Sequence, residues 1–406
     1  MGKIGLLEVV KNKQSRIYHE NVLFKNLNDP TTLYVDKGVN YSRQTTFNHQ
    51  NAAVNQTAKF QVIRSFKTGA LTNVTYTVVD PTVNNGKTIN VLHIGDSFTD
   101  IGTWVKECKT LLNAQGVTYN LIGTCGDSTF RAEGLSGGTL ANTFLNTSAG
   151  IGRKVQVTGM SVLPSTTYPG RTYRDSNGKD WTIRSGKIDG SGNGYIVVTK
   201  FGAVENDFIN FPSSGILTKQ GSGEGDATIT YSNPIPCYYN PFINPTNSQL
   251  DISNYLTTWG LTVPNIIVIQ FTWNDLGIWA SDVTINALLT NFKTAVDHIH
   301  TSLPSTKVIL SIEPCGSING NMDWNGKKYS VLRFAELMNA KFEDDSNYNT
   351  WLKIAPSYAF VDLINGYSSS SVAPCERYSS ITEVSGGDGI HPSTTGMQQI
   401  ACCWLS

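Results

Sequence analysis

The chain has 406 residues, and its 31 Lys and Arg balance 31 Asp and Glu, so the formal net charge is zero. This balance gives no reason to expect a nucleic acid or a membrane surface as the main partner. No run approaches the roughly 20 apolar residues of a membrane span. Seven cysteines, an odd number without a C-x-x-C pair, argue against a disulfide framework and against a zinc site.

Residues 1–88 predict an N-terminal β-rich region. Short alternating runs, such as 60–63 and 74–79, are separated by Asn, Asp, Gly and Thr, and no helical period of useful length is present. An Asn-Asn-Gly turn at 84–86 closes the region. The first ten residues lack the apolar core and cleavage site of a signal peptide. We therefore expect a cytoplasmic protein, or an extracellular or periplasmic one if a leader has been removed.

After residue 88 the pattern changes to alternating strands and helices. The run 89–94 is nearly continuously apolar, as expected for a strand that is covered on both faces. Apolar residues at helical spacing follow it up to Leu112. Further strands are expected at 118–122, 265–271, 307–312 and 358–363, and helices at 284–302, 328–343 and 393–404. This alternation predicts a parallel sheet with helices on both sides.

One segment interrupts the alternation. Residues 151–245 are rich in Gly, Ser, Thr and Asn, and Asn177-Gly178 between two short β-like runs is a strong hairpin signal. Further strands are expected at 195–198 and 227–230. The segment is therefore interpreted as an inserted β-rich subdomain.

Asp388 and His391, near the carboxyl end, form a D-x-x-H pattern in a Gly-containing turn. An Asp at this spacing can place its carboxylate on one imidazole nitrogen and leave the other nitrogen to face a serine. A serine needs such a base to take its proton before it attacks a carbonyl carbon. The pair therefore predicts two members of a hydrolase triad.

Three serines compete for the role of nucleophile. Ser97 follows the buried run 89–94 and precedes a helical pattern, so its hydroxyl is expected at a strand end beside free helix N–H groups. Ser128 repeats the Gly-Asp-Ser tripeptide, but no helix start follows it. Ser136 fits G-x-S-x-G, but the residues before it do not form the pattern of a core strand. The context favours Ser97.

Four short blocks in order along the chain resemble the signature of the SGNH (GDSL-type) hydrolase superfamily of esterases and lipases. They are GDSFTD at 95–100, EGLSGGT at 133–139, TWND at 272–275 and DGIHP at 388–392. The resemblance covers roughly residues 89–150 and 250–406. It implies a three-layer α/β/α core with a parallel sheet over residues 89–150 and 246–406. Thr272 replaces the usual Gly of the third block and the bulky Trp273 follows it, which predicts a narrowed acyl pocket.

The resemblance also implies the chemistry. Ser97 is expected to attack an ester carbonyl, His391 to transfer the proton, and Asp388 to orient His391. The N–H groups of Ser97 and Gly137 and the side-chain amide of Asn274 are expected to form the oxyanion hole. No metal or organic cofactor is required. The expected substrate is a small ester or an acylated carbohydrate, with acetyl as the expected acyl group.

Other functions stay open at this point. Within the family, the alternative is a lipase or esterase for longer acyl chains. From another class, the chain could be a carbohydrate-binding or attachment protein with an inactive hydrolase core, although the intact site residues weigh against that. A peptidase or thioesterase would use the same chemistry. The sequence leaves the oligomeric state open, as it does the roles of 1–88 and 151–245.

The remaining polar residues are expected to be structural. His93 is interpreted as a hydrogen-bonded core residue, and His298 and His300, two apart on a helix, point in different directions. Asp100 and Asp275 are expected to cap turns or orient the backbone near the site. The candidates for stacking on sugars, which more commonly fill cores, are Trp181, Trp259, Trp273, Trp279 and Trp324.

Overall fold

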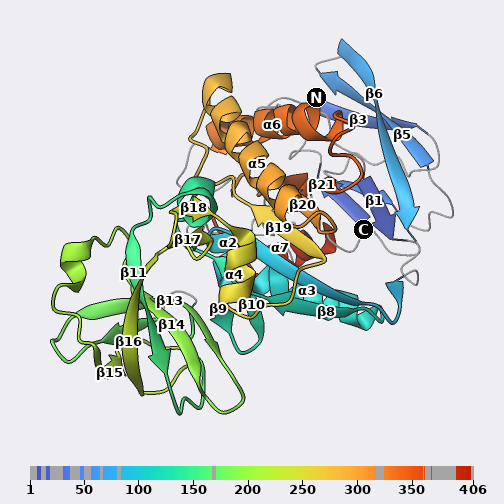
Figure 1. Ribbon diagram of the computed structural model, residues 1–406. Helices are drawn as coiled ribbons and strands as arrows, with labels where there is room; N and C mark the ends of the chain where they lie inside the picture. Colours follow the sequence, from blue (N-terminus) through green and yellow to red (C-terminus); the bar gives the residue numbers. More distant parts are fainter. Residues whose placement is uncertain are drawn as a thin grey trace, which may run out of the picture.

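The structure is a computed structural model. It describes the backbone of six strands between residues 7 and 79, and residues 84–166, 171–316, 324–359, 361, 367 and 390–403. In this part of the chain the architecture is mixed α/β, with a central parallel sheet and a separate β-barrel (Figure 1). None of the described helices is long and apolar enough to cross a membrane.

Five parallel strands form the central sheet. In sheet order they are β21 (Leu352–Ala355), β20 (Lys307–Ser311), β19 (Ile266–Gln270), β7 (Thr88–Gly95) and β8 (Thr118–Ile122). The first strand of the set, β7, lies between the second, β8, and the third, β19, so the order reverses between β7 and β19. In open α/β sheets, ligands bind outside the carboxyl ends of the strands at such a reversal.

A short pair of strands joins the sheet at the carboxyl end of β7. β10 (Phe130–Gly134) pairs in parallel with the last two residues of β7, and β9 (Cys125–Asp127) pairs with β10 in antiparallel. Gly134 at the end of β10 lies so close to the next layer that an added Cβ would meet a backbone nitrogen of Asp100 at 2.3 Å. The segment after β10 is therefore held directly against the helix that follows β7.

Helices cover both faces of the sheet, as the alternating pattern predicts. α3 (Thr103–Ala114) packs with α7 (Thr394–Cys403) on one face, and α5 (Asp282–Ser302) packs with α6 (Trp324–Met338) on the other (Figure 1). The α6 helix continues into a π-helical turn, η4 (Asn339–Glu343). These bounds agree with the helices expected at 284–302, 328–343 and 393–404.

The strand expected at 358–363 is wrong where the structure describes it, because Tyr358 and Ala359 belong to a 3-10 turn, η5 (Ser357–Ala359), whereas 360, 362 and 363 lie outside the described residues. Within the described part of the chain, the last strand of the sheet is β21. Because β21 lies at the edge of the sheet, it needs no continuous apolar run, and its Lys353 is exposed. The apolar residues Tyr358 and Ala359 are buried in the core without belonging to a strand.

The β-rich insertion contains a closed six-stranded barrel. In barrel order its strands are β11 (Ile151–Val157), β14 (Gly194–Thr199), β13 (Asp180–Ile188), β12 (Thr172–Arg174), β15 (Ser214–Lys219) and β16 (Thr228–Tyr238). The hairpin predicted at Asn177-Gly178 joins β12 to β13. Alternating residues such as Val155, Ile183 and Leu217 fill the interior, which has a hydrophobic core of its own.

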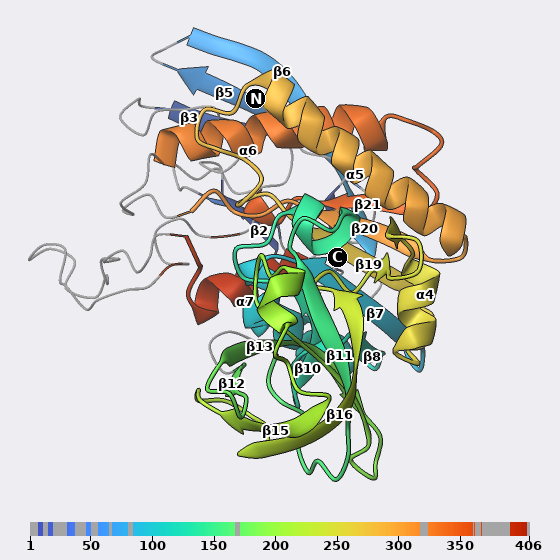
Figure 2. The same cartoon turned by 60° about the vertical axis from the view of Figure 1, so that its left-hand side comes forward.

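The N-terminal strands form two separate sheets, one of four strands and one of two. β1 (Leu7–Val10), β6 (Lys67–Val79), β5 (Gln56–Arg64) and β3 (Thr31–Asp36) pair in that order, and β2 (Ser15–Tyr18) pairs with β4 (Thr46–His49). The views in Figures 1 and 2 place the four-stranded sheet beside α5 and α6, at the opposite end of the molecule from the barrel.

Candidate active site

Ser97 stands where the switch-point rule places a ligand. It follows the carboxyl end of β7 and is the first residue of the short helix α2 (Ser97–Ile101). Asp96 caps this helix, because its Oδ1 accepts a hydrogen bond from Phe98 N at 3.0 Å. Ser97 itself is 9 % exposed, so its hydroxyl is sheltered without being sealed from the surface.

His391 comes from the far end of the chain to meet this serine. Its Nε2 lies 2.8 Å from Ser97 Oγ, although 294 residues separate the two. The imidazole packs at 5.5 Å against the ring of Phe98, and α7, which begins three residues later, packs on α3. The structure therefore brings together the predicted nucleophile and its predicted base. Asp388 lies outside the described residues.

Asn274 lies in the loop after β19, the strand next to β7 at the reversal. Its side-chain Nδ2 donates to Asp96 Oδ2 and to Gly138 O, both at 3.0 Å. The first bond ties the amide to the cap of the helix that carries Ser97. The second ties it to the loop that contains Gly137. The Asn274 amide thus joins two segments of the chain, at Asp96 and at Gly138, that each lie more than 100 residues before it.

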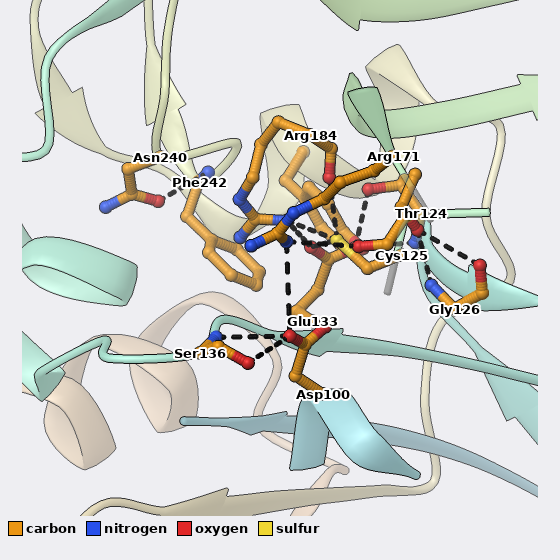
Figure 3. A network of polar contacts seen from close by, with 12 residues as sticks. Asp100, Thr124, Cys125, Gly126, Glu133, Ser136, Arg171, Arg184, Asn240 and Phe242 are labelled. Carbon is orange, nitrogen blue, oxygen red and sulfur yellow. Dashed lines mark hydrogen bonds and ion pairs between the residues drawn. The ribbon is translucent and has the colours of Figure 1, made fainter. Parts of the chain in front are cut away.

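The Gly137 loop is held from two sides. On one side, Asp100 Oδ2 accepts hydrogen bonds from Ser136 Oγ at 2.5 Å and Ser136 N at 3.2 Å (Figure 3). On the other side, the Asp275 carboxylate accepts from Leu140 N at 3.2 Å. Gly137 has a φ of 74°, a left-handed conformation that favours glycine even though no atom would obstruct a Cβ there.

Asp100 and Asp275 thus orient the backbone, as the sequence predicts. Both carboxyls are buried, and burial raises their pKa values; that of Asp275 is raised to about 7. For Asp275, the Leu140 N–H opposes this effect, whereas the nearby Glu313 adds to it. Asp100 thus links α2 to the Gly137 loop, and Asp275 links the loop after β19 to the same segment.

The two alternative serines have other partners. Ser128 lies in the turn between β9 and β10, where its Oγ donates to Glu224 Oε1 at 2.5 Å. Ser136 donates to Asp100. The prediction that no core strand precedes Ser136 is wrong, because β10 is a strand with Glu133 fully buried. Of the three candidate serines, it is Ser97 that the structure shows in contact with a histidine.

Three other histidines, His93, His298 and His300, have structural contacts. Burial lowers the pKa of His93 to about 3, and its Nε2 lies 3.0 Å from Tyr119 OH, so the expected core role is confirmed. His298 Nε2 accepts from Ile252 N at 3.3 Å, at the start of α4 (Ile252–Thr258). His300 stacks on Trp351 with ring centroids 4.0 Å apart.

A buried ion pair joins the barrel to the sheet beside this site. Arg184 on β13 lies 3.2 Å from Glu133 on β10, and both side chains are fully buried. Glu133 Oε1 also accepts from Thr124 Oγ1 at 2.7 Å (Figure 3). It accepts from Tyr255 OH at 2.7 Å as well. Because Glu133 begins the segment that leads to Gly137, this junction fixes the barrel against the candidate oxyanion loop.

Two buried charged residues at the site were not singled out from the sequence. Glu313 follows the carboxyl end of β20 and accepts from Trp273 N at 2.6 Å. Lys327 on α6 donates to Trp273 O at 2.7 Å and to Leu276 O, and burial lowers its pKa to about 8. The sequence signal that could have identified Glu313 is an acidic residue directly after a buried strand, at the edge of the sheet where the other site residues lie.

No family model matches the chain, and no curated protein matches it. Among solved structures, a family 3 carbohydrate esterase from Clostridium thermocellum is similar at a TM-score of 0.36 and 14 % identity, over 78 % of this chain and 93 % of that one. A peptidoglycan O-acetylesterase is similar at 0.36 and 12 %, over 80 % and 91 %. A family 2 carbohydrate esterase from Clostridium thermocellum is similar at 0.33 and 12 %, over 93 % and 83 %.

Proposed function

We propose that the chain is a serine ester hydrolase of the SGNH type that removes short acyl groups, above all acetyl, from carbohydrates or other small esters. The observation that carries this proposal is the 2.8 Å contact between Ser97 Oγ and His391 Nε2 at the reversal of the sheet order. A serine and a histidine in hydrogen-bonding contact are the signature of an activated nucleophile. Residues 89–150 and 246–406 would form the catalytic core, 151–245 the inserted subdomain and 1–88 the N-terminal region.

In the proposed reaction, Ser97 Oγ forms a bond to the ester carbonyl carbon while its proton moves to His391 Nε2. The bond to the leaving alcohol then breaks, and His391 returns the proton to the alcohol oxygen. Water attacks the acyl-enzyme with His391 again acting as base, and the carboxylic acid leaves. Asp388 would orient His391 through its other nitrogen.

The oxyanion of the tetrahedral intermediate would be held by Ser97 N, Gly137 N and the Asn274 amide. The Asn274 amide bonds to Gly138 O, next to Gly137, which supports a common site for these donors. Both Nδ2 hydrogens already have acceptors, so the amide must redirect or share one of them when the oxyanion forms. Of these two acceptors, the Gly138 carbonyl lies on the loop that contains Gly137.

Two observations support a short acyl group on a sugar. Trp273, directly before Asn274, is a bulky buried residue next to Thr272, which stands where the family normally has Gly, and this favours a small acyl group. Trp279, five residues beyond Asn274, is 57 % exposed, and its ring lies 5.5 Å from that of Tyr329. An exposed indole beside a catalytic loop offers an apolar face of the kind on which sugar rings pack.

The experiment is to follow p-nitrophenol release from acetyl, butyryl and octanoyl esters by the wild type and by three alanine variants. The proposal expects Ser97→Ala to abolish turnover, whereas Ser128→Ala and Ser136→Ala keep a nucleophile and stay active. Preference for the acetyl ester supports a short-acyl hydrolase, whereas preference for the octanoyl ester would favour a lipase. A wild type that hydrolyses none of the three esters contradicts the proposal.

A further inference from the structure

A buried carboxyl pair lies beneath the proposed site and contacts both of its halves. Glu313 is fully buried, and its Oε2 accepts hydrogen bonds from Thr272 N at 2.8 Å and Trp273 N at 2.6 Å. These are the two residues directly before Asn274. Glu313 therefore holds the backbone of the turn that presents the Asn274 amide.

Asp96 is the other member of the pair and is also fully buried. One of its oxygens accepts from Phe98 N, which fixes the helix that begins with Ser97. The other oxygen accepts from Asn274 Nδ2 at 3.0 Å. Asp96 therefore contacts the nucleophile's helix and the oxyanion amide with a single carboxyl group.

The two carboxyls lie in hydrogen-bonding contact with each other. Two carboxylate oxygens cannot bond unless a proton lies between them, because both are acceptors. Within the described residues, no other group donates to Glu313 Oε1, which is buried. Two other ionisable groups act on the pair: Asp275, across the turn, and Lys327 on α6, which donates to Trp273 O and is attracted to both carboxyls.

The charges agree with a protonated Asp96. Burial, together with the neighbouring Glu313 carboxyl, raises the pKa of Asp96 well above its usual range. For Glu313, burial raises the pKa, but the hydrogen bond from Asp96 and the N–H groups of Trp273 and Thr272 oppose this. The proton is thus favoured on Asp96, and Glu313 is the acceptor.

We propose that Asp96 and Glu313 share one proton in an acid–carboxylate hydrogen bond, and that this bond positions the Asn274 amide relative to Ser97. Both are positioning residues in this proposal, since their printed side-chain bonds go to the backbone and to Asn274 rather than to Ser97 Oγ. The inference deepens the proposed function and rests on it for the catalytic consequence. The shared proton itself is a property of the folded protein that is measurable without a substrate.

The Glu313→Gln variant separates two roles of the pair: holding the backbone of the turn before Asn274, and sharing a proton. In Glu313→Gln, the amide oxygen accepts from Thr272 N and Trp273 N, and the amide NH₂ donates to Asp96, which is then ionised. The geometry is kept and the shared proton is lost. Glu313→Ala instead leaves both N–H groups and Asp96 without their partner. In Asp96→Asn, the new NH₂ donates to Glu313, but Asn274 loses its acceptor.

The first readout is infrared difference spectroscopy above the pKa of Asp275, with Glu336→Gln as the control for an exposed glutamate on α6. The inference expects a protonated-carboxyl C=O band in the wild type and in Glu336→Gln. The same band should be absent from Glu313→Gln and Asp96→Asn. Equal bands in the wild type and Glu313→Gln would overturn the shared proton, whether or not the protein hydrolyses any ester.

The second readout is kcat and KM for the acetyl ester, with kcat expressed per titrated active site. Glu313→Gln is expected to keep most of kcat, whereas Glu313→Ala and Asp96→Asn lose about 10²-fold in kcat, as for a displaced oxyanion donor, with KM little changed. An active wild type whose Asp96→Asn variant keeps full kcat overturns the positioning role. A Glu313→Gln variant as impaired as Glu313→Ala overturns it as well. An inactive wild type that shows the infrared band contradicts the proposed function and leaves the shared proton standing.

Discussion

The Asn274 side chain is expected to stabilise both the folded protein and the transition state, and the contribution to the transition state is expected to be the larger. Its amide makes two hydrogen bonds, to Asp96 and to Gly138, each 3.0 Å long. At about 1 kcal/mol each, their loss in Asn274→Ala should lower the free energy of unfolding by about 2 kcal/mol. The loss of one oxyanion donor should in addition lower kcat by about 10²–10³, or about 3–4 kcal/mol of transition-state stabilisation.

A matched variant separates the two effects. Asn240 makes two similar bonds, since its Nδ2 donates to Asn146 O and its Oδ1 accepts from Phe242 N, both at 3.0 Å. Asn240→Ala should therefore cost about the same stability, again about 2 kcal/mol, without lowering kcat. The assays are thermal unfolding and steady-state hydrolysis of p-nitrophenyl acetate below the lower of the two midpoints.

The expected pattern is a similar loss of stability in both variants and a large loss of kcat in Asn274→Ala alone. If Asn274→Ala keeps the wild-type kcat, the amide is not an oxyanion donor. If both variants lose kcat by the same factor, the effect comes from the fold and the reasoning is refuted.

Three further predictions follow from other parts of the structure. Arg184→Met should leave the Glu133 carboxylate buried without its cation and lower the free energy of unfolding in urea by about 3–5 kcal/mol. The matched Arg174→Met, at an exposed pair of the same barrel, should change it little, and equal losses would contradict this. Trp279→Ala should raise KM for an acetylated oligosaccharide but not for p-nitrophenyl acetate; an unchanged KM for both would remove the sugar-stacking role. Because the folded pKa of Asp275 is raised to about 7, its contribution to stability should fall as pH rises from about 4 to about 7, at up to about 1.4 kcal/mol per pH unit, and a thermal-unfolding series should show a flatter slope in Asp275→Asn.

The part of the site that local sequence determines was predictable. The run 89–94, the Gly-Asp-Ser turn and the helical spacing after it are contiguous, so they predict the strand, the serine and the helix without knowledge of the rest of the chain. His391 was predictable from its D-x-x-H pattern, although its contact with Ser97 spans 294 residues. In both cases the informative residues lie within a few positions of the functional one.

What the sequence did not predict depends on partners far along the chain. β10 was missed because Arg131 and Glu133 make it look polar, and the residue that allows Glu133 to be buried is Arg184 on the barrel. Glu313 was missed for the same reason, since its role follows from contacts with Asp96 and Trp273. β21 was misplaced because an edge strand needs only a weak apolar pattern.

The most direct test of the proposed nucleophile is covalent labelling of the wild-type chain with a fluorophosphonate, followed by mass spectrometry of its peptides. A single adduct on Ser97 is expected, formed slowly or not at all in His391→Ala, because His391 Nε2 takes the Ser97 proton. An adduct on Ser128 or Ser136, or no adduct on any serine, would contradict the assignment.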